Sequence, residues 1–211
     1  MTRSPDKDDG ISNLVQRLDM AMDPSATRII TFISARPGEG TSTVARDYAL
    51  ALSDTVEHKI LLIDAGNLEE DYFASHQADP TVTIADIMTA GRPLADALYP
   101  IGTHVLLGRW SSPGRGRSAA TKLLNDDAFW KNLHESFGAV VIDAPSLKES
   151  ADGIGLAVRA DATVLVVEAE KTRQPVVENL RDTLTQGGAK IAGVVMNKRR
   201  YYIPAKVYQN M

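Results

Sequence analysis

The amino-acid sequence predicts an α/β protein: a doubly wound, mostly parallel sheet with helices on both faces. Short, continuous apolar runs recur along the chain, and longer segments with the period of an α-helix separate them. Continuous apolar runs are typical of strands covered on both faces, and regular alternation of strands with helices is typical of parallel sheets. Ligands of such sheets bind at the carboxyl ends of the strands, so the functional site is expected there.

The expected strands are short, apolar and rich in β-branched residues. They are 28–34, 59–64, 104–107, 139–143, 162–168 and 190–197. Two of the expected helices have clear ends. One begins near Thr172, with Pro175 in its first turn, and stops at Gly187. The other is capped by Asp126 or Asp127, since a carboxylate there can accept hydrogen bonds from the first turn.

Composition excludes several classes of protein. The chain has 211 residues, of which 23 are basic and 27 acidic, a net charge of −4 and no cysteine. The absence of cysteine excludes disulfides, thiolate nucleophiles and Cys-ligated zinc. No apolar run approaches the ~18 residues of a membrane span, and the first ten residues lack a signal-peptide core, so we expect a soluble, unsecreted protein. The acidic balance argues against a nucleic-acid partner.

The segment between the first strand and the next helix resembles a phosphate-binding loop. Gly38 and Gly40 permit backbone dihedrals that turn successive N–H groups toward one anion, and the following helix adds its positive end. The P-loop signature requires Lys and then Ser or Thr after the last glycine, whereas Thr41 and Ser42 stand here. The loop alone leaves two interpretations open, a nucleotide site or a glycine-rich turn.

Two aspartates close apolar strands at the same edge of the expected sheet and favour the nucleotide site. They are Asp64 after ILLI and Asp143 after AVVI. An aspartate at this position is where a P-loop protein holds Mg²⁺, directly or through water. A single such residue is often a loop cap, but two of them behind one glycine-rich loop predict a metal-assisted phosphate site.

Longer segments resemble a known family in order and spacing. The similarity covers residues 28–200 and includes ARPGEGTSTVARDYALAL, ILLIDAGN, VVIDAPSLKESADGIGLAVRADATVLVVEAEKTR and AGVVMNKRRYY. These segments resemble the bacterial tyrosine autokinases of capsule and exopolysaccharide synthesis, which are similar in turn to the MinD/ParA-like P-loop ATPases. The resemblance implies a P-loop NTPase fold and a site for ATP or ADP with Mg²⁺.

The resemblance also assigns roles residue by residue. The implied nucleotide-binding residues are Arg36, Pro37, Gly38, Glu39, Gly40, Thr41, Ser42, Thr43 and Asn197. The implied magnesium ligands are Ser42, Asp64 and Asp143, and Asp64 is also the implied catalytic carboxylate. The implied phosphorylation sites in a tyrosine-containing tail are Tyr201, Tyr202 and Tyr208.

Three departures from the family pattern predict weak nucleotide binding and weak phosphoryl transfer. Thr41 replaces the loop lysine, Gly66 replaces the second acid of an Asp-x-Asp motif, and Leu68 stands where the family usually has Arg. Losing one charged hydrogen bond to phosphate costs ~1.5–3 kcal/mol of binding free energy. Phosphoryl transfer depends almost wholly on positioning and charge neutralisation, so catalysis should suffer more than binding. We therefore expect a degenerate kinase that binds nucleotide weakly.

Arg36 leaves a further question open. It stands where MinD/ParA-like ATPases carry a signature lysine that reaches a nucleotide, often across a dimer. The guanidinium either replaces part of the missing charge, because guanidinium binds phosphate well, or is a solvated loop arginine.

The expected organisation is an N-terminal arm with a short helix (1–27), a P-loop kinase-like domain (28–200) and a basic tail (201–211). The arm's helix is expected from Ile11 to Met22. A homo-oligomer is compatible with the family, but the arm lacks the spaced Glu and Arg residues through which family kinases form rings.

The expected function is that of a cytoplasmic, kinase-like component of exopolysaccharide or capsule synthesis and export. The family implies an inner-membrane chain-length or co-polymerase partner that would hold the protein at the membrane. Two alternatives stay open: an active ATP-dependent tyrosine autokinase and a ParA/MinD-like positioning ATPase. In the active kinase, Arg36, Lys148 or Lys198 would replace the missing lysine.

Overall fold

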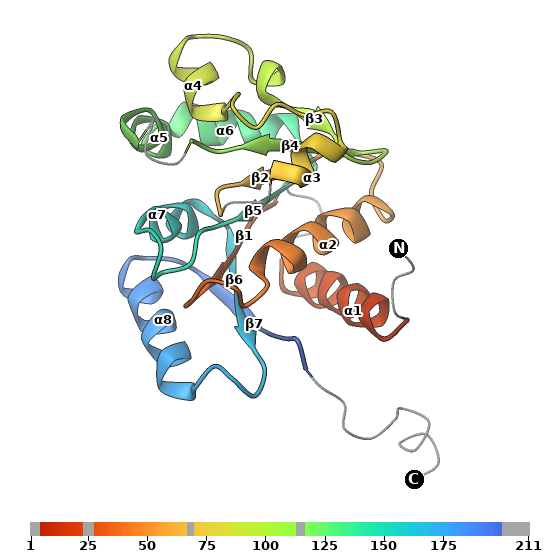
Figure 1. Ribbon diagram of the computed structural model, residues 1–211, viewed down its shortest axis with the longest axis vertical. Coiled ribbons are helices and arrows are strands. Elements are labelled where there is room, and N and C mark those ends of the chain that lie inside the picture. The colour runs from red at the N-terminus through yellow and green to blue at the C-terminus, as the bar shows by residue number, and fades with distance from the viewer. Residues whose placement is uncertain (1–4, 23–27, 67–69, 113–116, 200–211) are drawn as a thin grey trace.

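The protein forms a seven-stranded sheet between two layers of helices (Figure 1). The computed structural model describes residues 5–22, 28–66, 70–112 and 117–199. The strands are β1 (Arg28–Ser34), β2 (Ile60–Asp64), β3 (Tyr99–Pro100), β4 (Val105–Arg109), β5 (Ala139–Asp143), β6 (Ala162–Glu168) and β7 (Ile191–Asn197). The helices are α1 (Pro5–Ala21), α2 (Thr41–Ser53), α3 (Glu70–Ser75), α4 (Ile84–Thr89), α5 (Arg117–Leu124), α6 (Asp127–Ser136), α7 (Asp152–Arg159) and α8 (Gln174–Gln186), with a 3-10 turn at Leu94–Ala97.

The predicted fold class is confirmed. The strand order is β3-β4-β2-β5-β1-β6-β7, and every pairing is parallel except that of β3 with β4. β1 lies between β5 and β6, and the loop that follows it leads into α2. The carboxyl ends of β1, β5 and β2 therefore lie side by side, where a doubly wound sheet is expected to bind its ligand.

Side chains of each central strand alternate between two hydrophobic layers. In β1, Ile30 and Phe32 pack in a cluster with residues of α1, α2 and α3, whereas Ile29 and Ile33 pack with residues of α4 to α8. Burying each such side chain contributes ~1.5–3 kcal/mol to stability. The core thus fixes the strand ends that carry the polar residues of the site.

Helix caps explain where two helices begin and end. The carboxylate of Asp126 accepts hydrogen bonds from the N–H groups of Ala128 and Phe129 and begins α6. Pro175 lies in the first turn of α8, and Gly187 ends that helix. These caps are the ones the sequence predicts.

Four elements differ from the sequence-based expectation. α1 begins at Pro5 instead of Ile11, because proline is accommodated in a first helical turn and the polar residues after it show no apolar period. β4 extends two residues beyond Leu107, to Arg109, and the short antiparallel β3 was not predicted. β7 is a sheet edge with one open face, where Val194 is 51% and Met196 is 66% exposed.

Among the described residues, none of the helices has both the length and the apolar character required to cross a bilayer.

Candidate functional site

The loop after β1 has the backbone of an anion-binding site. Gly38 and Gly40 adopt φ values of 82° and 92°, in the left-handed region that glycine enters without steric cost. Gly40 caps α2 without a side chain, and the first turn of α2 contains no acidic residue. The first N–H groups of a helix have no partner within it, so this end of α2 presents donors and a positive dipole.

Glu39 and Asn197 hold the loop in shape. The Glu39 side chain is buried, and its carboxylate accepts a hydrogen bond from the backbone N–H of Arg36 at 2.9 Å and another from the Thr172 hydroxyl. Asn197, at the end of β7, donates its amide to the Glu39 carbonyl at 3.0 Å. A Cβ on Gly40 would lie 2.1 Å from the Asn197 amide nitrogen, so only glycine fits there.

A polar cavity of about 540 Å³ opens above the loop. Of the residues predicted to bind nucleotide, those that line it are Pro37, Gly38, Gly40, Thr41, Ser42 and Thr43. Arg36, Glu39 and Asn197 are not among the lining residues. Glu39 and Asn197 instead stabilise the conformation of the loop through the hydrogen bonds described above. The cavity also has lining residues for which no role was predicted: Ser34, Arg46, Tyr72, Ser146 and Glu149.

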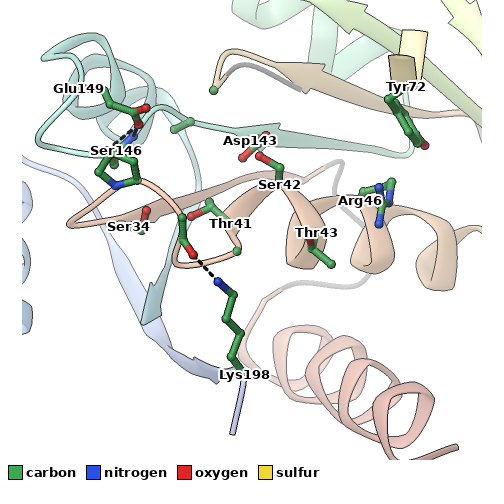
Figure 2. Close-up of a pocket in the computed structure, with 15 residues that line it drawn as sticks. Ser34, Thr41, Ser42, Thr43, Arg46, Tyr72, Asp143, Ser146, Glu149 and Lys198 are labelled. Carbon is green, nitrogen blue, oxygen red and sulfur yellow. Dashed lines mark hydrogen bonds between the residues drawn. The ribbon is translucent and has the colours of Figure 1, made fainter. Parts of the chain in front are cut away.

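Asp143 lines the cavity as a buried carboxylate. The residue is 1% exposed, and neither of its carboxylate oxygens has a hydrogen-bond partner among the described residues. Burial and the neighbouring Asp64 raise the pKa of Asp143 to about 8, against the opposite effect of the Ser42 hydroxyl, which faces it (Figure 2). This pKa keeps Asp143 largely protonated in the free protein at neutral pH, and a cation bound here would displace the proton and take the carboxylate as its ligand.

The pair of Asp143 and Ser42 fits Mg²⁺ when a phosphate is also present. Within the described parts of the chain, no group of three acidic, histidine or cysteine side chains gathers to hold a metal ion. Mg²⁺ in phosphate sites typically takes one or two carboxylates and completes its shell with water and phosphate oxygens. These two residues would hold the ion, which would supply positive charge next to the phosphates.

Asp64 lies beside this site but faces another partner. It is 1% exposed and is not among the residues lining the cavity. One carboxylate oxygen accepts from Arg109 Nε at 3.2 Å, and the other accepts from the Gly66 N–H at 3.2 Å. The Arg109 guanidinium lies 4.4 Å from the centre of the Phe73 ring. Asp64 is thus half of a buried ion pair within the protein.

Arg109 was missed in the sequence because its strand was expected to end at Leu107. In the structure Arg109 is the last residue of β4 and lies in register with Asp64, which is in register with Asp143. Had the strand expected at 104–107 been extended by two residues, the sequence would have predicted Arg109 at a strand end, beside the two aspartates.

The predicted phosphorylation sites Tyr201, Tyr202 and Tyr208 lie outside the described residues, as does Leu68.

The strand order and the glycine-rich loop define the fold: it is the P-loop NTPase fold of MinD/ParA type. The septum site-determining protein MinD from Pyrococcus horikoshii, solved with Mg-ADP, superposes with a TM-score of 0.64 at 20% identity, over 87% of this chain and 76% of that one. The kinase domain of the Escherichia coli tyrosine kinase ETK superposes with a TM-score of 0.77 at 18% identity, over 94% and 79%. The VpsO kinase domain gives 0.68 at 23% identity, over 92% and 98%.

Within this class, the relatives of the chain are bacterial tyrosine-protein kinases, as the sequence motifs predicted. The tyrosine-protein kinase CpsD of Streptococcus agalactiae is 26% identical over 186 residues, which is 86% of this chain and 80% of CpsD. The succinoglycan biosynthesis transport protein ExoP of Rhizobium meliloti is 25% identical over 189 residues, which is 85% of this chain and 23% of ExoP. No protein-family model matches the chain.

Proposed function

We propose that this protein is a nucleotide-binding, tyrosine-kinase-like component of exopolysaccharide or capsule synthesis in which phosphoryl transfer is weak or absent. Its role is regulatory: it docks on a membrane co-polymerase partner and responds to the nucleotide that it binds. The name of the relative ExoP supports the assignment to polysaccharide synthesis and the membrane partner, and the geometry of the site supports weak phosphoryl transfer.

The observation that carries this proposal is the buried ion pair of Asp64 with Arg109. A carboxylate that orients a metal or a nucleophile must face the cavity with its charge available. Asp64 is turned to a guanidinium from the next strand, and its other oxygen accepts a backbone N–H. Gly66 contributes no carboxylate, and Thr41 contributes no charge. The groups that would drive phosphoryl transfer are therefore absent or already engaged.

Nucleotide binding is supported separately. The cavity combines the backbone donors of the loop with Ser42 and Asp143, which are suited to Mg²⁺. A structural neighbour with the same fold was solved with Mg-ADP. We propose ATP or ADP with Mg²⁺ as the ligand.

The experiment combines calorimetry with an assay of phosphorylation. Titration with Mg-ATP and Mg-ADP should show binding weaker than about 10 μM, which corresponds to about 7 kcal/mol. Incubation with Mg-ATP should leave no phosphotyrosine by immunoblot or mass spectrometry, whereas CpsD treated in parallel serves as the positive control. Vigorous autophosphorylation of the wild-type chain would contradict the proposal and favour an active kinase.

The partner is tested in cells of the source organism. We expect a polysaccharide-export membrane protein to co-purify with the tagged chain and to place it at the cytoplasmic face of the inner membrane. If none of the membrane proteins encoded beside it co-purified with the chain, the proposed docking would be refuted. The support for this part is that ExoP, a protein about four times as long as the matched region, is named for polysaccharide transport.

A further inference from the structure

The cavity lacks a lysine on the loop, yet two cationic side chains from other elements line it. Among the described residues, the basic side chains at the cavity are Arg46 of α2 and Lys198, immediately after β7. Thr41, at the position of the P-loop lysine, also lines the cavity and is 8% exposed. A polyphosphate brings several negative charges, which a neutral threonine does not balance.

Arg46 is placed to reach the first turn of α2. It follows Ser42 by four residues, so both side chains lie on one face of the helix. Helical side chains lean toward the N-terminus, and one turn is ~5.4 Å, which a guanidinium can span. Its side chain is 28% exposed, its Nε is 3.5 Å from Asp47, and its guanidinium lies 5.2 Å from the centre of the Tyr72 ring. None of these contacts is a short hydrogen bond that would hold it away from a phosphate.

The charge of Arg46 already acts on the site. Together with the Ser42 hydroxyl it lowers the pKa of Asp143, although burial and acidic neighbours outweigh both effects. Figure 2 shows Arg46 on the same helix as Ser42, with the Tyr72 ring beside it.

Lys198 approaches from the opposite side of the loop. Its ammonium group donates a hydrogen bond to the carbonyl of Gly38, which Figure 2 shows as a dashed line. It is also 3.8 Å from Glu168, but Glu168 has Lys171 as a second cationic partner at 3.2 Å. Lys198 can therefore turn from the Gly38 carbonyl to a phosphate without leaving Glu168 unpaired.

A second observation points independently to a charged ligand. Asp143 is a buried carboxylate that lines the same cavity and has no hydrogen-bond partner among the described residues. A second acidic side chain lining the described part of the cavity, Glu149, is engaged by the N–H and hydroxyl of Ser146 at 3.1 and 2.6 Å. The cavity thus offers backbone donors and two cations for an anion, and one free carboxylate for a metal ion.

We propose that Arg46 and Lys198 bind the phosphate groups of the ligand and replace, from two sides, the charge of the missing loop lysine. The inference rests on the proposed nucleotide binding and names the residues on which that binding depends. It assigns no role in ligand binding to Arg36, which lies outside the lining of the cavity.

The test measures dissociation constants by calorimetry for Mg-ADP and for pyrophosphate, without any reading of kinase activity. The variants are Arg46→Met and Lys198→Met, which keep side-chain length and remove charge. Arg17→Met and Lys122→Met are matched controls at exposed positions outside the cavity. We expect about tenfold weaker binding for Arg46→Met and about fivefold for the more exposed Lys198→Met, with both controls within twofold of wild type. Arg46→Lys and Lys198→Arg should restore part of the loss, and thermal unfolding checks that each variant folds.

The outcomes separate this inference from the proposed function. Nucleotide binding that is unchanged in both variants, or lost only in Arg36→Met, would overturn the inference and leave the proposed nucleotide binding intact. Pyrophosphate binding that depends on Arg46 and Lys198, with no binding of Mg-ADP or Mg-ATP, would keep the inference and overturn the nucleotide assignment. Absence of binding for every probe by the folded wild-type chain would overturn both.

Discussion

Replacing Arg109 by methionine should leave Asp64 as a buried, uncompensated carboxylate. The two side chains are 9% and 1% exposed, so solvent screens their interaction little. Removing one partner of a buried ion pair costs ~3–5 kcal/mol, because the remaining charge keeps its desolvation penalty. Asp64→Asn should cost less, because the amide oxygen can still accept a hydrogen bond from Arg109, whose guanidinium also keeps its contact with the Phe73 ring. The double variant should lose less unfolding free energy than the sum of the losses in the two single variants, by at least ~1 kcal/mol.

The assay is urea unfolding of the four proteins near neutral pH, with and without ~10 mM MgCl₂. Without its guanidinium partner, Asp64 should attract a cation, so Mg²⁺ should stabilise Arg109→Met more than wild type. A coupling free energy below ~0.5 kcal/mol, with the same Mg²⁺ response in both proteins, would refute the assignment of Asp64 to an internal ion pair.

Three further predictions concern the loop and its acid. At pH 8, Asp143→Asn should be more stable than wild type by about a few kcal/mol, and this advantage should disappear toward pH 4. The reason is that the folded-state pKa of Asp143, about 8, makes the stability of the wild type fall as pH rises from 4 to 8. Chemical unfolding across this pH range measures the difference, with Glu57→Gln at an exposed position as the control. Thr41→Lys should tighten Mg-ATP binding by ~1.5–3 kcal/mol without restoring phosphotransfer, as calorimetry and a phosphotyrosine blot would show; a vigorous kinase would contradict this expectation. Gly40→Ala should destabilise the protein more than Gly38→Ala in thermal unfolding, because both have positive φ but only the first Cβ meets a side chain; equal losses would argue against that close contact.

The sequence was sufficient for the parts of the fold that depend on local pattern. Continuous apolar runs located the six long strands within two residues, and glycine spacing located the loop. The ends of β2 and β5 placed Asp64 and Asp143 together because parallel strands bring their carboxyl ends to one edge. The open face of β7 could not be foreseen, since an apolar run does not say whether a helix covers it.

The side-chain contacts that determine the chemistry of the site join residues far apart in the sequence, so local sequence patterns did not predict them. Arg109 meets Asp64 through strand pairing across 45 positions of sequence, which no window along the chain can detect. Lys198 meets Gly38 across 160 positions. Arg46 is different, because its spacing from Ser42 is one helical turn and the helix was expected, so the sequence did contain the signal that places it at the site.

The way Glu39 and Asn197 hold the phosphate loop bears on how such a protein can change its activity over time. Their hydrogen bonds run to Arg36 N–H, to the Thr172 hydroxyl and to a loop carbonyl, and none of them involves the side chain at position 41. The conformation of the loop is therefore encoded by residues other than the one that supplies charge to the nucleotide. A lineage could exchange lysine for threonine there without losing the folded loop, and selection on binding could then act on Arg46 and Lys198 independently of selection on stability.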